Sequence, residues 1–337
     1  MKKMRTELKG REIMEIKNEH YQIIKTITEN VERVIIGKTD SIYLSLVAIL
    51  SKGHMLIEDV PGVGKTMLIR ALSKTLGGEF KRIQFTPDLL PSDVTGVSIF
   101  NQKNLEFEYR PGPIMANIVL ADEINRTSPK TQSALLEAME ESMITIDGKS
   151  YPLPAPFFVM ATQNPIEYEG TFPLPEAQLD RFLLKIKMGY PSLEDEVKIL
   201  EKIQYIHPIE EIEQKISMEQ IVQMQESIKD VYIDDSLRRY IVEIVDTTRK
   251  HRSVYLGASP RGSIALFRGS QALALIKGRD FVVPDDIKFL ADPVLNHRII
   301  LKSEARLHGQ TVENMLSEVL KEVSVPVTRT KTMSRKG

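Results

Sequence analysis

The stretch that decides the fold runs Asp59-Val60-Pro61-Gly62-Val63-Gly64-Lys65-Thr66. It follows an apolar run at 55–57 and precedes a helical pattern of apolar residues that starts at Met67. Strand, glycine loop, Lys-Thr and helix together form the context of a phosphate-binding P-loop. In such a loop the backbone N–H groups face phosphate oxygens, Lys65 neutralises the β- and γ-phosphates, and the Thr66 hydroxyl holds Mg²⁺. The positive end of the helix dipole strengthens this attraction.

One residue departs from the general P-loop pattern G-x-x-x-x-G-K-[ST], because Asp59 stands in the place of its first glycine. This departure leaves a second interpretation open, a glycine turn that joins a strand to a helix and binds no ligand. A second motif favours the nucleotide site. The apolar run 117–121 ends in Asp122 and Glu123, which is the Walker B arrangement. Asp122 is expected to hold Mg²⁺ together with Thr66, and Glu123 to accept a proton from the attacking water. The two motifs predict a site for ATP and Mg²⁺.

Composition restricts the class of protein. The chain has 337 residues, a net charge of −1 and no cysteine. This length suits about two domains, and the near-neutral charge gives no field that would attract nucleic acid or an anionic membrane. The lack of cysteine excludes disulfides and metal–thiolate sites, and the six histidines are too scattered for a metal site. The N-terminus is charged, and the longest apolar run, 42–50, is too short to span a bilayer. We expect a cytoplasmic protein that does not insert into membranes.

Strand and helix patterns alternate in the first half of the chain. After a charged amphipathic helix at 10–33, strands are predicted at 55–58, 81–85, 117–121, 156–161 and 183–188, with helices at 40–51, 66–77, 129–142 and 176–181. This alternation is typical of an α/β fold in which helices flank a mainly parallel sheet. Two β-hairpin insertions interrupt it, one at 97–109 and one at 143–153 with an Asp147-Gly148 turn. An alternative interpretation is that both hairpins simply pack on the surface and have no functional role.

Helical patterns dominate from Pro191 onward. Helices are predicted at 192–205, 217–229, 235–251, 260–277, 284–291 and 294–306, and the only strand-like stretches are short ones such as 281–283. We therefore predict an ATP-binding domain with N-terminal helices at 1–190, an all-helical domain at 191–323, and a flexible basic tail at 324–337.

Three more polar residues stand where an ATPase needs them. Asn164 follows the strand that is expected beside Walker B, from where an amide can orient the attacking water. Arg181 lies at the far edge of the first domain, and Arg261 begins a helix after Ser259 and Pro260. By composition alone, each of the three could equally be a cap or a surface ion pair.

The set of motifs and their order resemble the MoxR family of AAA+ ATPases, over roughly residues 30–310. In this family Asp59 is usual at the first P-loop position. The resemblance rests on Glu58 to Thr66, on Ala121-Asp122-Glu123-Ile124-Asn125-Arg126 with Gln132 to Glu141, on Ala161-Thr162-Gln163-Asn164-Pro165, on Leu174 to Phe182, and on Gly257-Ala258-Ser259-Pro260-Arg261.

The resemblance implies roles for individual residues. Asn164 matches sensor 1, Arg181 matches the arginine finger that reaches the ATP of a neighbouring subunit, and Arg261 matches sensor 2 on the helical lid. Whether Arg261 acts in its own subunit or in the neighbour stays open, as does the choice for Arg126 between an intersubunit role and an ion pair. The nucleotide-binding set includes the expected adenine-packing segment and the P-loop with its flanks: Val34, Ile35, Ile36, Gly37, Val60, Pro61, Gly62, Val63, Gly64, Lys65, Thr66, Met67 and Asp122.

The resemblance also implies a function, a ring of six subunits that hydrolyses ATP and, like a chaperone, remodels or matures partner proteins. Proteins with a von Willebrand factor A domain are the expected partners. Three alternatives stay open at this point: a nucleic-acid motor or transcription activator, a nucleotide-gated scaffold with little turnover, and a metal-chelatase motor subunit. The net charge of −1 and the lack of an appended DNA-binding motif disfavour the first. The catalytic set Glu123, Asn164 and Arg181 disfavours the second.

Overall fold

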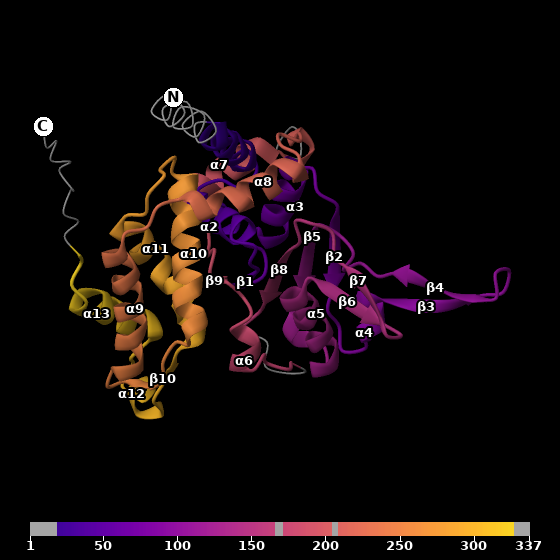
Figure 1. Ribbon diagram of the computed structural model, residues 1–337. Coiled ribbons are helices and arrows are strands. Elements are labelled where there is room, and N and C mark those ends of the chain that lie inside the picture. Colours follow the sequence, from indigo (N-terminus) through magenta and orange to yellow (C-terminus); the bar gives the residue numbers. More distant parts are fainter. Residues whose placement is uncertain (1–18, 166–170, 204–207, 327–337) are drawn as a thin grey trace, which may run out of the picture.

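The fold is given by a computed structural model that describes residues 19–165, 171–203 and 208–326. Its centre is a five-stranded sheet in the order β2-β5-β8-β1-β9, with every pair of neighbours parallel. The strands are β1 (Met55–Glu58), β2 (Phe80–Gln84), β5 (Ile118–Asp122), β8 (Phe158–Gln163) and β9 (Leu184–Ile186). Helices on both faces cover this sheet (Figure 1). The predicted α/β class is therefore confirmed.

Both faces of the sheet are buried, which explains why the central strands are continuous apolar runs. In β5, Ile118 and Leu120 pack into one hydrophobic cluster, while Val119 and Ala121 pack into the other. This alternation follows from the two-residue period of a strand. The first cluster includes α2 (Thr39–Leu50) and α3 (Lys65–Leu76), and the second includes α5 (Pro129–Glu141). The part of the chain that forms the sheet also contains the short helices α4 (Pro91–Thr95) and α6 (Glu176–Leu179).

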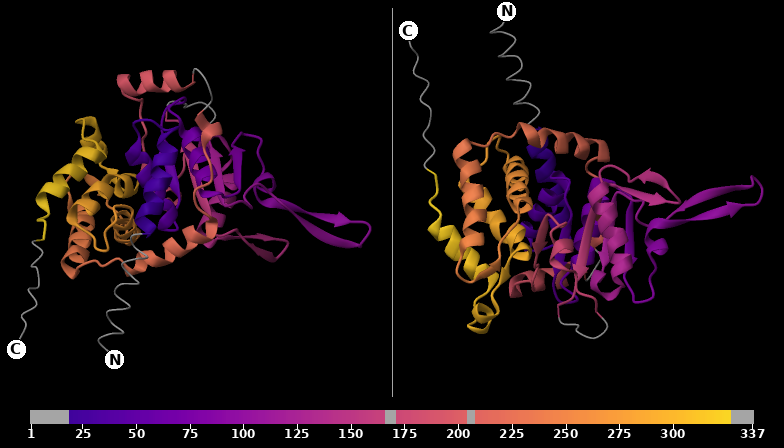
Figure 2. Two further views of the ribbon diagram at one scale, coloured as in Figure 1. Left: turned by 90° about the horizontal axis from the view of Figure 1, so that it is seen from above. Right: turned by 60° about the horizontal axis from the view of Figure 1, so that its bottom comes forward.

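Two β-hairpins leave this core, as the alternating patterns predict. One pairs β3 (Gly96–Asn101) with β4 (Glu106–Pro111), and the other pairs β6 (Met143–Ile146) with β7 (Lys149–Pro152). The β3–β4 hairpin extends far from the body in every view (Figure 1, Figure 2). At its base the Tyr109 ring stacks on the Tyr151 ring of the other hairpin, with centroids 4.3 Å apart. The two hairpins are therefore anchored together.

The C-terminal half is mainly helical. Its helices are α7 (Leu193–Ile203), α8 (Met218–Ser227), α9 (Asp235–Lys250), α10 (Pro260–Ile276), α11 (Pro284–Leu295), α12 (Ser303–Leu307) and α13 (Val312–Glu322). Single 3₁₀ turns in this half are η2 (Pro208–Glu211), η3 (Ile228–Asp230) and η4 (Asn296–Arg298), while η1 (Ile124–Arg126) follows β5 in the first half. A two-stranded antiparallel sheet joins β10 (Val254–Leu256) to β11 (Ile300–Leu301).

Details of this half differ from the sequence prediction. The predicted helix 284–291 is confirmed but ends too early, because α11 continues through Pro293 to Leu295, and the predicted single helix 294–306 is wrong. A proline in the last turn removes a single hydrogen bond and ends the helix soon afterwards. The chain then forms η4, β11 and the short α12. The sequence prediction also missed β10 and α13, and 281–283 forms no strand, since Phe281 makes only an isolated bridge with Tyr232.

The N-terminal helix is observed from residue 19, the first that is described, to residue 32. The predicted start at residue 10 and the end of the predicted basic tail, 327–337, lie outside the described residues. Across the described ranges, no helix is long and apolar enough to cross a membrane.

Candidate functional site

The loop between β1 and α3 is shaped to accept a ligand against its backbone. Gly62 and Gly64 have φ angles of 87° and 93°, a left-handed conformation that suits glycine. Apart from the adjacent residues, no atom of the described chain lies within 4 Å of the place where a Cβ of either residue would stand. The loop therefore leaves open space on the Cβ side of both glycines, at the N-terminus of the 12-residue helix α3. Lys65 and Thr66 are the first two residues of this helix.

The Lys65 ammonium is held at this loop and is partly withdrawn from water. Its Nζ donates a hydrogen bond of 2.6 Å to the carbonyl oxygen of Asp59. Burial lowers the pKa of Lys65, while the carboxylates of Asp59, Asp122 and Glu123 oppose this shift. A partly desolvated cation beside an open loop is suited to bind an anion such as a phosphate group.

Asp59 has a structural task that explains why it replaces glycine. Its Oδ1 accepts a hydrogen bond of 2.8 Å from the Val60 N–H, and its Oδ2 accepts one of 2.6 Å from the Gly189 N–H. Gly189 belongs to the segment between β9 and α7. The Asp59 side chain therefore ties the P-loop to the connection that leads into the helical half.

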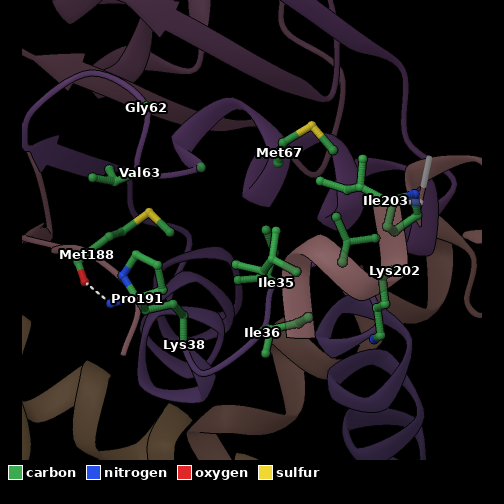
Figure 3. Close-up of a pocket in the computed structure, with 14 residues that line it drawn as sticks. Ile35, Ile36, Lys38, Gly62, Val63, Met67, Met188, Pro191, Lys202 and Ile203 are labelled. Atoms are coloured by element: carbon green, nitrogen blue, oxygen red, sulfur yellow. Dashed lines mark hydrogen bonds between the residues drawn. The ribbon is translucent and has the colours of Figure 1, made fainter. Parts of the chain in front are cut away.

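A mainly apolar cavity of about 280 Å³ opens next to the P-loop (Figure 3). Among the predicted nucleotide-binding residues, those that line it are Val34, Ile35, Ile36, Gly62, Val63, Gly64 and Met67. Gly37, Val60, Pro61, Lys65, Thr66 and Asp122 are not among its lining residues. The sequence analysis missed further lining residues, which are Lys38, Met188, Pro191, Ile199, Lys202, Ile203 and Pro208. An apolar cavity beside a glycine loop suits a flat base attached to phosphates.

The segment after β9 and the helix α7 form one wall of this cavity. Lys38 fixes the segment, since its Nζ donates a hydrogen bond of 2.6 Å to the Met188 carbonyl (Figure 3) and one of 2.8 Å to the Tyr190 carbonyl. Gly37 lies directly against the carboxylate of Asp195 on α7, where any larger residue would collide with it. Apart from Lys38, the missed lining residues all follow β9, in a part of the chain that carries no sequence motif.

Asp122 is the last residue of β5 and lies at the carboxyl edge of the sheet. Its Oδ1 accepts a hydrogen bond of 2.6 Å from the Thr162 hydroxyl, and its Oδ2 accepts bonds of 3.1 Å and 2.6 Å from Arg82 on β2. Carboxylate and hydroxyl oxygens are the ligands that Mg²⁺ prefers, so Asp122 and Thr66 fit the chemistry of that ion.

Glu123 is held by three neighbours. Its N–H donates a hydrogen bond of 2.9 Å to Thr162 Oγ1, and its Oε2 accepts one of 2.7 Å from Gln84 Nε2. Arg126 Nε lies 3.4 Å from the same oxygen, so Arg126 forms the ion pair that was one of its two predicted roles. Glu123 also has a φ of 59°, a left-handed conformation that few non-glycine residues adopt. Such conformations cluster at functional sites.

Asn164 completes the group at the carboxyl edge. It follows β8 directly and is buried, and β8 lies between β5 and β1 in the sheet. The carboxyl ends of three adjacent parallel strands therefore bring together the P-loop, the Asp122-Glu123 pair and Asn164, as the sequence predicts.

Arg181 and Arg261 do not join this group. Leu183 N–H donates to the His54 carbonyl, which places Arg181 just before the start of β9, beside the start of β1. The P-loop follows the other end of β1. The four residues of β1 separate the P-loop from the level of Arg181 by about 13 Å, at about 3.3 Å per residue. Both arginines contact Glu140 on α5, with Arg181 Nη1 at 3.2 Å from Oε2 and Arg261 Nη2 at 2.7 Å from Oε1. The two arginines therefore lie together at the amino end of the sheet.

Comparison with known proteins agrees with this geometry. Residues 54–184 match the ATPase family associated with various cellular activities (AAA), and residues 246–319 match the AAA lid domain. Chaperone MoxR1 of Mycobacterium tuberculosis is 43% identical over 88% of this chain and 80% of its own length. The chain belongs to the MoxR family of AAA+ ATPases.

Two further similarities cover nearly the whole of this MoxR-family chain. The uncharacterised protein YeaC of Bacillus subtilis is 60% identical over 92% of this chain and 97% of its own length. The crystal structure of a protein of Cytophaga hutchinsonii to which an ATPase activity is ascribed has a TM-score of 0.88 and 40% identity, and the match covers 95% of this chain and 99% of that one.

Proposed function

We propose that this MoxR-family protein assembles into a ring, hydrolyses ATP at the contacts between its subunits, and uses the energy to remodel or mature partner proteins. The observation that carries the proposal is the separation of the catalytic charges. The P-loop and Glu123 lie at the carboxyl end of the sheet, whereas Arg181 and Arg261 lie together at the amino end. A second subunit that presents its amino-end arginines to this P-loop would complete the site.

Within one subunit we assign binding and proton transfer. The P-loop N–H groups and Lys65 bind phosphate oxygens, and the apolar cavity takes the base. Thr66 and Asp122 would hold Mg²⁺, which when bound neutralises phosphate charge. Glu123 accepts the proton of the attacking water, and Asn164 holds that water in line. Glu123 must first turn away from Gln84 and Arg126, which hold its carboxylate in this structure.

The neighbouring subunit supplies the remaining charge. Arg181 acts as the arginine finger, and Arg261 acts with it from the same neighbour, because both are bound to one carboxylate, that of Glu140. Phosphoryl transfer depends mainly on positioning and on neutralising charge, so a site that lacks these cations turns over slowly. Hydrolysis thus depends on assembly. By family resemblance we propose six subunits, with the ATP-binding domain at 1–190 and the lid domain at 191–323.

The output is proposed to be action on proteins in the cytoplasm. The relative MoxR1 is named a chaperone, which supports this proposal. The β3–β4 hairpin exposes apolar residues and carboxylates, including Phe100, Leu105, Phe107, Glu106 and Glu108. The exposed Lys103 and Arg110 balance the two carboxylates, so the hairpin shows apolar side chains without the excess positive charge that the phosphate backbone of nucleic acid attracts. A protein with a von Willebrand factor A domain is the first partner to test.

A Glu123→Gln variant in the presence of ATP and Mg²⁺ tests the proposal. The variant keeps the P-loop and loses the base, so it should bind ATP, hydrolyse it at less than about one hundredth of the normal rate, and remain assembled. Light scattering should show a particle several times heavier than the 38.3 kDa chain. Affinity capture from a lysate should then recover protein partners. An ATP-bound variant that stays at the mass of one chain would contradict ring formation. Salt-sensitive stimulation of the unmodified enzyme by DNA or RNA, with none by protein, would favour a nucleic-acid motor.

A further inference from the structure

Helix α7 carries apolar side chains that its own chain does not cover. Leu193, Val197 and Leu200 have exposed fractions of 76%, 47% and 67%. Their spacing of four and three residues places them on one face of the helix. No residue of α7 is buried, and Figure 2 shows this helix at the outer margin of the molecule, at the top of the left view. Such a stripe of large apolar side chains on a helix usually marks a contact surface.

The position of this stripe is linked to the nucleotide site. Ile199 and Ile203, on the adjoining face of α7, line the cavity beside the P-loop. The segment that leads into α7 is fixed by the Asp59 carboxylate from the P-loop and by Lys38. Hydrogen bonds therefore connect the P-loop to the segment that leads into α7, and a partner bound to the stripe lies next to the cavity.

Charge indicates what this partner is. Glu194, Glu196 and Glu201 flank the stripe, all are exposed, and none forms an ion pair within the described residues. Of the two lysines of α7, Lys198 pairs with Asp195 of the same helix and Lys202 donates to the Arg33 carbonyl, so each already has a partner in its own chain. An acidic rim of this kind is repelled by anionic membranes and attracted to a basic surface with an apolar centre.

The chain itself carries such a surface at the other end of the sheet. On α10, Arg261, Ile264 and Arg268 are spaced three and four residues apart and are all exposed, with Ile264 at 52%. They border a hollow lined by five basic side chains and two carboxylates, namely Lys52, Arg181, Arg261, Arg268, Arg298, Glu140 and Asp180. This face includes the arginines that must approach a neighbour's P-loop.

We infer that the α7 stripe of one subunit packs against the Ile264 face of α10 on the next subunit, with Glu201 and Arg268 on opposite sides of the contact. The inference rests on the proposed function, since it needs a neighbour that delivers Arg181 and Arg261 to the ATP site. The inference adds to the proposed function the two surfaces that meet between subunits, and it assigns α7 the role of sensing nucleotide at that interface.

Cysteine cross-linking tests the contact directly, because the chain has no cysteine of its own. A Leu200→Cys protein is mixed with an Ile264→Cys protein, both in the Glu123→Gln background, and a short bismaleimide is added with or without ATP. We expect a covalent dimer that forms with ATP and is at least about fivefold weaker without it. Val242→Cys, at an exposed apolar position of α9, replaces Ile264→Cys in the control mixture and should give no dimer.

Charge exchange provides a second test. Glu201→Arg and Arg268→Glu should each raise the protein concentration needed for half-assembly by about tenfold, and the double variant should return to within about threefold of the unmodified protein. A Leu193→Ser, Val197→Ser, Leu200→Ser variant should fold normally and assemble poorly.

The outcomes separate the two claims. Failure of the unmodified protein to assemble with ATP would overturn the proposed function and this inference together. Rings that assemble and hydrolyse ATP, without a 200–264 cross-link above the Val242 control or without rescue in the charge exchange, would overturn only the inference. Normal assembly of the triple serine variant with loss of a client protein would show that the stripe binds the client instead.

Discussion

Gln84 Nε2 donates a hydrogen bond of 2.7 Å to Glu123 Oε2 and so links the end of the edge strand β2 to the proposed catalytic base. Gln84 does not line the cavity beside the P-loop. The Gln84 hydrogen bond therefore affects the orientation of the Glu123 carboxylate and does not involve the nucleotide cavity.

Replacing Gln84 by Ala should raise the basal ATPase rate. The bond holds the Glu123 carboxylate in place, and one hydrogen bond of about 1 kcal/mol corresponds to roughly a fivefold change in rate. The affinity for ATP should stay within about twofold, because the cavity is unchanged. Steady-state ATPase assays and ATP titrations measure both. Lys81→Ala on the same strand is the matched control, because among the described residues Lys81 forms its ion pair with Glu79 alone. A slower enzyme would mean that Gln84 supports the base.

Arg82→Ala should lower the Mg²⁺ concentration that half-activates the enzyme. Arg82 donates to Asp122 Oδ2 and so competes with the ion for that oxygen. The Arg82 side chain is half exposed, so the pair contributes only about 0.5–1 kcal/mol, or roughly a two- to fivefold shift. ATPase activity across a Mg²⁺ titration gives the value. A higher requirement for Mg²⁺ in the variant would show that Arg82 helps to place Asp122.

Glu140→Ala should lower kcat by about tenfold and leave ATP affinity unchanged. Glu140 fixes the directions of Arg181 and Arg261, and misplaced catalytic groups cost rate. All three side chains are partly exposed, so the free energy of unfolding should change by less than about 1 kcal/mol. Glu141→Ala, at the neighbouring exposed position, is the control. An unchanged kcat would show that Glu140 does not position Arg181 and Arg261 for catalysis.

Acid should destabilise the fold through His54. Burial lowers the pKa of His54 to about 4, below the usual 6.5, and its Nδ1 accepts a hydrogen bond from the Val159 N–H, which a second proton would prevent. The unfolded chain then binds the proton more readily, so stability is full above pH 6.5 and falls between pH 6.5 and about 4. The loss amounts to about 3 kcal/mol.

Urea unfolding of the unmodified protein and of His54→Gln is measured at several pH values. The difference between the two free energies of unfolding gives the contribution of His54. The two stability curves should converge as the pH falls from 6.5 to 4. Parallel curves would exclude His54 as the source. His297 is also buried with a pKa well below its usual value, so some acid sensitivity should persist in the variant.

The sequence predicts those parts of the site whose residues are close together in the chain. Lys65-Thr66 and Asp122-Glu123 each follow an apolar strand, and this context is sufficient to place them at one edge of the sheet. The Asp147-Gly148 turn signals its hairpin for the same reason. In each case local conformation determines the position.

The residues that the sequence analysis missed depend on contacts between distant segments. Lys38 binds carbonyls 150 and 152 residues away, and Asp59 binds Gly189 across 130 residues. The periodicity of apolar residues along a helix or strand gives no information about contacts between such distant residues. The only local signal for Arg82 and Gln84 is that both flank the apolar Ile83 in β2, a pattern that fits any half-exposed edge strand. β10 and β11 were missed because strands of three and two residues carry too little pattern.

Mixing two inactive variants tests the central claim, catalysis by arginines from a neighbouring subunit. Lys65→Ala lacks a working P-loop and Arg181→Ala lacks the finger, so each alone should show almost no turnover. In an equal mixture, about a quarter of the contacts join an intact P-loop to an intact finger if subunits assemble at random. Lys65→Ala mixed with Glu123→Gln is the control, because no contact there is complete. We predict that the first mixture regains up to about a quarter of the normal rate and the control none. Mixed rings with no activity at any ratio would contradict the account.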